Sequence, residues 1–238
     1  MSHLLAGSNI STGYDQLQIL WDVSLHVDDG ERVVILGANG AGKTTLLKTL
    51  VGLMPAWRGS IELTGEPVQH RSTDYRMRRN LAYVSDVGII ADLSVEDNLR
   101  IGGYHLSRSQ VQDKMGLMFE RFPILKERRR EAGGSLSGGQ RKMLAVARGL
   151  MSDPKLVLMD EPSAGLSPLL VNEVIEIIQS VEEEKIAFLI AEQNIKFLDI
   201  AHRVYVIDFG KVIFSGTVQE LQQNDAIRRA YFGVESLT

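Results

Sequence analysis

The sequence has no cysteine among its 238 residues, and this absence excludes disulfide bonds, cysteine-ligated zinc and thiol catalysis together. Its five histidines are scattered and form no H-x-x-x-H or similar metal-binding pair. We therefore expect any metal ion to arrive together with a ligand.

Long apolar segments and an excess of positive charge are missing as well. No stretch approaches the ~18 consecutive apolar residues of a membrane-spanning helix, and no basic segment followed by an apolar run begins the chain. With 44% hydrophobic residues the chain can bury a substantial core, and we expect a globular protein in the cytoplasm. A net charge of −4 argues against nucleic acid as the main partner, because phosphate contacts need clustered Lys and Arg.

Residues 37–45 match the phosphate-binding pattern G-x-x-x-x-G-K-[ST]. An apolar run at 32–36 predicts a strand before this loop, and helical spacing over 45–50 predicts a helix after it. Backbone N–H groups of such a loop surround phosphate oxygens, and the helix adds its positive N-terminus. We expect Lys43 to reach the outer phosphates of ATP and the Thr44 hydroxyl to hold Mg²⁺. The predicted nucleotide-binding residues here are Gly37, Ala38, Asn39, Gly40, Ala41, Gly42, Lys43, Thr44 and Thr45.

Two acids follow an apolar run at 156–159, namely Asp160 and Glu161. Asp160 can hold Mg²⁺ through water, while Glu161 can polarise the water that attacks the γ-phosphate. Two acids after a strand can also cap a helix, but the phosphate loop upstream favours the catalytic interpretation.

A second glycine motif, Leu136-Ser137-Gly138-Gly139-Gln140, precedes a helix with Met143, Ala147, Leu150 and Met151 on one side. The Ser137 side chain and the glycine amides predict a second anion-binding helix start. The predicted ATP contacts of this motif are Ser137, Gly138, Gly139 and Gln140.

The order of predicted elements indicates an α/β fold. The first third is β-like, with alternation at Val23, Leu25 and Val27 and a further hairpin near 61–67, whereas the pattern between about 88 and 150 is helical. Met115, Met118, Phe119 and Phe122 share one helix face, which we interpret as core. Later apolar strands at 156–159, 187–190 and 204–207 alternate with a helix whose Val171, Val174, Ile175 and Ile178 share a face, so we expect a parallel sheet covered on both sides.

These predictions give a single domain over 1–238. Its core, about 1–87 and 153–238, is expected to be a P-loop NTPase core of RecA-like type with a mostly parallel sheet and an N-terminal antiparallel β subdomain. An α-helical subdomain is expected to be inserted at about 88–152. Two basic runs, Arg76 with Arg78 and Arg79, and 128–130, are interpreted as solvated faces.

The phosphate loop, the motif at 136–140 and the strand followed by Asp-Glu, in this order and spacing, resemble the ATP-binding cassette family, the ATPase subunits of ABC transporters. The resemblance covers essentially the whole chain. It implies that Tyr14 stacks on adenine, with an exposed loop tyrosine as the alternative, and that residues 163–167 form the D-loop. In the family two cassettes pair head to tail, so the Ser137 segment of one chain closes over ATP held by Lys43 of the other.

The resemblance also implies partners and a location. We expect a second cassette, either identical or related, transmembrane permease subunits and, indirectly, a substrate-binding protein. The chain would then lie in the cytoplasm, peripheral on the inner face of the cell membrane, with ATP and Mg²⁺ as its ligands.

Two positions depart from the general family pattern. Gln193 stands where most cassettes have a switch histidine, and its amide can donate a hydrogen bond to the γ-phosphate but cannot carry a proton. Asp86 stands where a glutamine is usual. Its carboxylate is a possible Mg²⁺ ligand, but its added negative charge beside the γ-phosphate predicts altered coupling.

The Glu-Gln-Asn form at 192–194 is similar to one branch of the family, the smaller ATPase subunit of branched-chain amino-acid importers and its urea or amide relatives. The segments 38–42, 163–168 and 228–233 also look like that branch. We therefore predict an ATPase that drives import of branched-chain or hydrophobic amino acids, with Glu161, Gln193 and Lys43 in catalysis.

Several alternatives stay open. The solute can instead be urea or a short amide, export is not strictly excluded, and Asp86 leaves room for a regulatory cassette with impaired hydrolysis. A soluble cassette acting on ribosomes or DNA needs two cassettes or a long coiled-coil insertion, and neither fits into 238 residues. An unrelated P-loop GTPase or kinase is disfavoured by the motif at 136–140.

Overall fold

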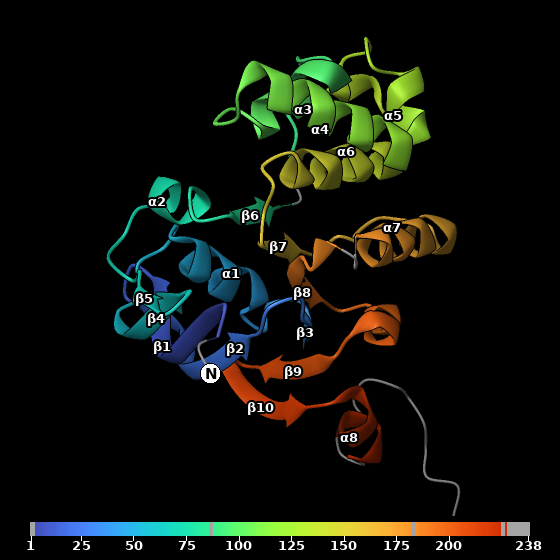
Figure 1. The fold of residues 1–238 in the computed structure, drawn as a ribbon. Coiled ribbons are helices and arrows are strands. Elements are labelled where there is room, and N and C mark those ends of the chain that lie inside the picture. The colour runs from blue at the N-terminus through green and yellow to red at the C-terminus, as the bar shows by residue number, and fades with distance from the viewer. Residues whose placement is uncertain (1–2, 86–87, 182–183, 225–226, 228–238) are drawn as a thin grey trace, which may run out of the picture.

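The computed structural model describes residues 3–85, 88–181, 184–224 and 227. Two sheets and helix α1 (Lys43–Val51) form the lower part of the molecule in Figure 1. A group of helices lies above them, namely α3 (Val95–Gly102), α4 (Arg108–Arg121), α5 (Pro123–Glu127) and α6 (Gly138–Leu150). None of the helices in the described ranges has the length and apolar character needed to cross a membrane.

One sheet is antiparallel and has the strand order β2-β1-β4-β5. Its strands are β1 (Leu5–Tyr14), β2 (Leu17–Val27), β4 (Arg58–Leu63) and β5 (Glu66–Pro67). The hairpin expected near 61–67 is present, but its turn lies at Thr64-Gly65 and not at the expected Gly65-Glu66-Pro67, because Glu66 and Pro67 pair with Leu63 and Glu62. The N-terminal antiparallel β region is therefore confirmed.

The other sheet has the order β10-β9-β3-β8-β7-β6 and is parallel except at its β9–β10 edge. Its strands are β3 (Arg32–Leu36), β6 (Leu81–Val84), β7 (Leu156–Asp160), β8 (Ala187–Glu192), β9 (Arg203–Asp208) and β10 (Lys211–Gly216). Since β3, β8 and β7 are neighbours, the segments that follow these three strands meet at one edge of the sheet.

The helices connect these strands. They are α1 (Lys43–Val51), α2 (Thr73–Met77), α3 (Val95–Gly102), α4 (Arg108–Arg121), α5 (Pro123–Glu127), α6 (Gly138–Leu150), α7 (Pro168–Ser180) and α8 (Val218–Gln223). Short 3₁₀ helices occupy Gly133–Ser135 and Ile195–Ile200.

The parallel sheet separates two hydrophobic cores. Val33 and Ile35 of β3 belong to a core shared with α1 and the antiparallel sheet, whereas Val34 and Leu36 belong to a core shared with α6 and α7. This alternation is what a strand covered on both faces requires. The expected core face of α4 is confirmed, since Met115, Met118 and Phe122 are buried and Phe119 packs against them.

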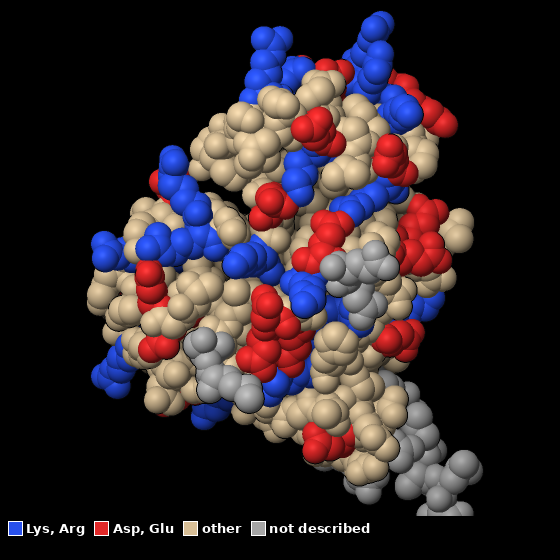
Figure 2. Space-filling model, viewed as in Figure 1, with Lys and Arg blue, Asp and Glu red and all other residues tan. Residues whose placement is uncertain are grey.

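One sequence-based expectation about charge is wrong. Arg76, assigned to a solvated face, is 1% exposed, because its guanidinium turns inward to the backbone of α1. Arg78 is exposed as expected. On the face drawn in Figure 2, basic and acidic side chains are interspersed. The expectation that nucleic acid is not a partner stays a prediction.

Candidate nucleotide site

The loop between β3 and α1 has the backbone shape that a phosphate loop needs. Gly40 and Gly42 have φ values of 81° and 108°, a region that favours glycine. Gly42 is also the N-cap of α1. Because it has no side chain, it supplies no capping acceptor to the first N–H groups of the helix. A side chain at Gly37 would meet the Ile207 carbonyl oxygen at 2.6 Å. The loop can therefore approach an anion closely with its backbone.

The Lys43 ammonium group lies within this loop. The side chain is 3% exposed, and Nζ donates to the carbonyl oxygens of Gly37 (2.8 Å) and Ala38 (3.0 Å). Nζ also lies 3.1 Å from Oε1 of Glu161. The positive charge is thus held where the motif predicts phosphate, and it is paired with the predicted catalytic acid.

Thr44 in the first turn of α1 and Asp160 at the end of β7 are far apart in the sequence but adjacent in the structure. Thr44 Oγ1 donates to Asp160 Oδ1 at 2.9 Å, and the Tyr83 hydroxyl donates to Asp160 Oδ2 at 3.1 Å. Burial raises the pKa of Asp160 above its ordinary value of 3.8, and burial together with the Asp160 carboxylate raises the pKa of Tyr83. A hydroxyl and a carboxylate side by side are hard oxygen donors, so this pair fits Mg²⁺.

Glu161 borders two cavities at the end of β7. One, of ≈ 380 Å³, is also lined by Thr44, Tyr83 and Asp160, and the other, of ≈ 390 Å³, is also lined by Asn39. The second cavity further includes Gln193 and Asn194 after β8 and Ser163, Ala164, Gly165 and Glu192. The backbone of Glu161 has φ 48° and its N–H donates to Ala191 O at 2.9 Å, which anchors the acid to β8.

Tyr14 and the motif at 136–140 lie outside these cavities. Tyr14 ends β1 and is 46% exposed. Ser137 is the N-cap of α6: its side chain accepts from Gln140 N at 3.3 Å, and its own N–H donates to Gln140 Oε1 at 3.0 Å. Ser137 and Gly138 are exposed, so this helix start faces outward. Asp86, the third predicted metal ligand, lies outside the described residues.

Three residues at the site were not predicted from the sequence. Tyr83 bonds to Asp160, Lys142 donates from α6 to the Glu161 carbonyl oxygen at 3.2 Å, and Glu192 accepts hydrogen bonds at the end of β8. A signal was available only for Glu192, as a charged residue that ends an otherwise apolar strand. The contacts of Tyr83 and Lys142 depend on which strands and helices are neighbours.

The parallel sheet, the glycine loop before α1 and the acids at the end of β7 define a P-loop NTPase. Comparison with known proteins narrows this class. The family model described as "ABC transporter" matches residues 20–164. The chain is 40% identical to the high-affinity branched-chain amino acid transport ATP-binding protein BraG of Pseudomonas aeruginosa, covering 97% of this chain and 100% of that protein.

Two further similarities agree with that match. The lipopolysaccharide export system ATP-binding protein LptB of Escherichia coli is 35% identical, covering 96% of this chain and 97% of LptB. The fold is similar to that of the ADP conformation of MJ1267, an ATP-binding cassette of an ABC transporter. Their TM-score is 0.85 at 24% identity, covering 98% of this chain and 100% of that chain. The protein belongs to the ABC transporter family, and it is an ATP-binding, ATP-hydrolysing subunit of that family.

Proposed function

We propose that this subunit drives the import of branched-chain or other hydrophobic amino acids by hydrolysing Mg-ATP. The observation that carries the proposal is the convergence of Lys43, Thr44, Asp160, Glu161 and Gln193 on one sheet edge in a chain that aligns with BraG over its full length. Similarity to LptB, an export-system protein, leaves lipopolysaccharide-type substrates as the second candidate.

Each residue has a role in the proposed reaction. Lys43 and the loop amides bind the phosphates, Thr44 and Asp160 would hold Mg²⁺, and Glu161 orients and polarises the attacking water. When bound, the metal would supply positive charge that offsets the negative charge of the phosphates. Gln193 borders the same cavity as Glu161 and can donate an amide hydrogen bond to the γ-phosphate.

The solute is tested by transport. We would reconstitute the chain with permease subunits that co-purify with it and with a candidate substrate-binding protein, and measure ATP-dependent uptake of radiolabelled leucine, urea and acetamide into vesicles. Leucine uptake that requires ATP supports the proposal. Uptake of urea or acetamide alone, or ATP hydrolysis stimulated only by lipopolysaccharide, would replace it with an alternative.

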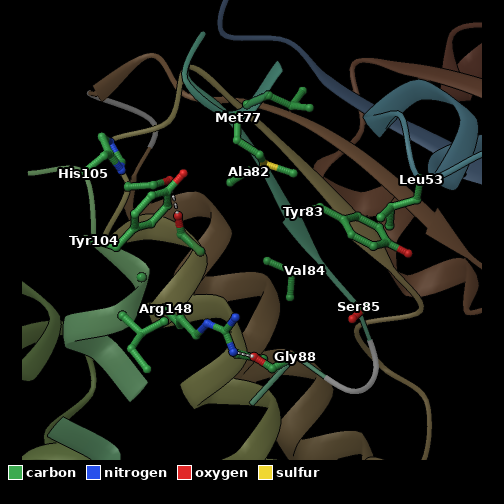
Figure 3. Close-up of a pocket in the computed structure, with 16 residues that line it drawn as sticks. Leu53, Met77, Ala82, Tyr83, Val84, Ser85, Gly88, Tyr104, His105 and Arg148 are labelled. Atoms are coloured by element: carbon green, nitrogen blue, oxygen red, sulfur yellow. Dashed lines mark hydrogen bonds between the residues drawn. The ribbon is translucent and has the colours of Figure 1, made fainter. Parts of the chain in front are cut away.

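A cleft between β6 and the helices α3 and α6 offers a docking place for the permease. It has a volume of ≈ 450 Å³ and is lined by Met77 and β6 on one side and by Ile101, Tyr104 and Arg148 on the other. Figure 3 shows Tyr83 and Ser85 at one end and Tyr104 and His105 at the other, with Arg148 bonded to the Gly88 carbonyl oxygen at 2.7 Å. Tyr104 is 60% exposed and Ile101 is 38% exposed, so apolar side-chain surface on this wall of the cleft would suit an inserted helix of a permease.

The cleft proposal is tested by changing one apolar wall residue. Ile101→Glu should abolish co-purification with the permease subunits and leave Mg-ATP binding intact, because Ile101 borders only this cleft among the cavities described. Leu117→Glu, at an exposed leucine on α4, is the matched control. Equal retention of the permease by both variants would place the docking surface elsewhere.

A further inference from the structure

Glu192 is a buried acid at the centre of the site. It ends β8, the strand between the phosphate-loop strand β3 and the acid-bearing strand β7. Its side chain is 2% exposed. Its own carbonyl oxygen accepts from Gly37 N at 3.2 Å, which fixes Glu192 to the start of the phosphate loop.

The carboxylate of Glu192 joins two separate loops. Oε1 accepts from the Ser163 N–H at 2.7 Å, in the segment that follows Glu161. Oε2 accepts from the N–H groups of Gln193 (3.0 Å) and Asn194 (3.1 Å). One oxygen therefore holds the loop behind the predicted catalytic acid, and the other holds the segment that carries the predicted γ-phosphate sensor.

The chemistry of this link requires a carboxylate. All three bonds are donated by backbone N–H groups, and a carboxylate can accept at both oxygens. A glutamine in the same place would present an NH₂ group to one of the two loops, so that donor would face donor and one side of the link would be lost. The loss is most costly on the Ser163 side, where the hydrogen bond is buried.

We propose that Glu192 is a positioning residue for ATP hydrolysis. It fixes Gln193 relative to the Ser163 segment and Glu161, so a movement of Gln193 onto the γ-phosphate is transmitted to the loop behind the catalytic acid. This inference rests on the proposed function, because it assumes that Glu161 and Gln193 act on ATP. Glu192 itself touches no nucleotide in this scheme.

The principal test is Glu192→Gln in the full-length chain, assayed with Mg-ATP. We expect kcat to fall by about 10-fold or more, with KM for ATP and the affinity for Mg-ADP within about 2-fold of the wild type. Glu31→Gln is the matched control. Its carboxylate also accepts from a backbone N–H, that of Asp28 at 2.8 Å, but it lies before β3, at the opposite end of the sheet. A wild-type kcat in Glu192→Gln would overturn the proposal.

A double-mutant cycle separates positioning from mere stabilisation. If Glu192 acts through Gln193, the total loss of kcat in the double variant Glu192→Gln/Gln193→Ala should be much smaller than the product of the two single losses. Fully multiplicative losses would show that the two residues act independently, and the proposal would be wrong.

Hydrogen exchange in the wild-type chain keeps the test valid if Glu192→Gln fails to fold. The amides of Ser163, Gln193 and Asn194 should exchange slowly even without nucleotide, because each donates to a buried carboxylate. Exchange as fast as in exposed loops would refute the link. Failure of the wild type to bind or hydrolyse Mg-ATP would refute the proposed function instead, and slow exchange at the three amides would distinguish the two outcomes.

Discussion

At the scale of single residues, the pair of Lys43 and Glu161 joins two groups that ATP has to separate. Lys43 Nζ lies 3.1 Å from Glu161 Oε1 and also donates to two loop carbonyl oxygens. A triphosphate in the loop would compete for the same ammonium group. Nucleotide binding would then release the Glu161 carboxylate toward the attacking water, so binding and activation of the acid are coupled.

Replacing that acid tests the coupling. We expect Glu161→Gln to lower kcat by about 10²-fold or more, because the neutral amide is a poor base. Mg-ATP affinity should be equal to or higher than that of the wild type, since the nucleotide no longer has to break an ion pair. Single-turnover hydrolysis and equilibrium nucleotide binding measure the two effects. Rapid turnover by this variant would remove Glu161 from the catalytic role.

The burial of the Asp160 carboxyl group indicates a conflict between the stability of the fold and metal binding. Burial raises its pKa, so the folded protein holds the proton more tightly than the unfolded chain does. For a carboxyl group with a raised pKa, the penalty on folding is complete above the folded-state pKa and disappears as the pH falls toward 3.8. Asp160→Asn should therefore raise the Tm of the nucleotide-free protein at pH 7, and by less near pH 4, close to the ordinary pKa of 3.8.

The same variant should gain less stability from Mg-ATP than the wild type, because a metal ligand is lost. Asp199→Asn, at an exposed acid, serves as the control. Thermal unfolding with and without Mg-ATP measures both effects. A variant that is less stable than the wild type at both pH values would contradict the assignment of a burial penalty to Asp160.

At the scale of elements, a buried arginine binds the C-terminal end of α1. The Arg76 guanidinium donates to the carbonyl oxygens of Thr49 (2.9 Å) and Leu50 (2.6 Å) in the last turn of α1. Thr49 O also accepts from the N–H of the C-cap residue Gly52 at 3.2 Å, so Arg76 adds to the cap, and a positive charge at a helix C-terminus is favourable. Arg76 thereby fixes the far end of the helix whose start faces the phosphates.

Arg76→Met should lower the free energy of unfolding by ~2–4 kcal/mol, because it removes the guanidinium that donates to buried carbonyl oxygens of α1. Arg78→Met should change it much less, since the ion pair of Arg78 with Asp74 is exposed to solvent. Urea denaturation compares the two. Similar values would mean that the inward guanidinium adds little to stability.

The elements also indicate what can be predicted from the chain alone. Strands β3, β7 and β8 and helices α1 and α7 were predictable because apolar spacing and the glycine motifs mark them directly. Lys43, Thr44, Asp160 and Glu161 were identified for the same reason. The burial of Arg76 and the links of Glu192 were not, because they depend on packing and sheet order, which no local pattern encodes.

At the scale of the whole molecule, the start of α6 at Ser137 and Gly138 is exposed, whereas the Lys43 side chain is buried within its own chain. Neither cavity beside Glu161 is lined by residues 137–140. An anion-binding helix start that lies open at the surface is expected if a second cassette supplies the phosphates. The ATP-bound form should then be a dimer whose two nucleotides lie between the chains.

Gly138 allows this dimer to be tested without disturbing the fold. A Cβ atom built at Gly138 meets nothing within 4 Å, and the same holds at Gly116 on α4. In the Glu161→Gln background, Mg-ATP should convert the chain to a dimer in light scattering. Gly138→Asp should prevent that conversion by placing a carboxylate against the triphosphate, with Mg-ADP binding and Tm retained, whereas Gly116→Asp should dimerise normally. ATP-driven dimers of the Gly138→Asp chain would mean that this helix start does not close over the nucleotide.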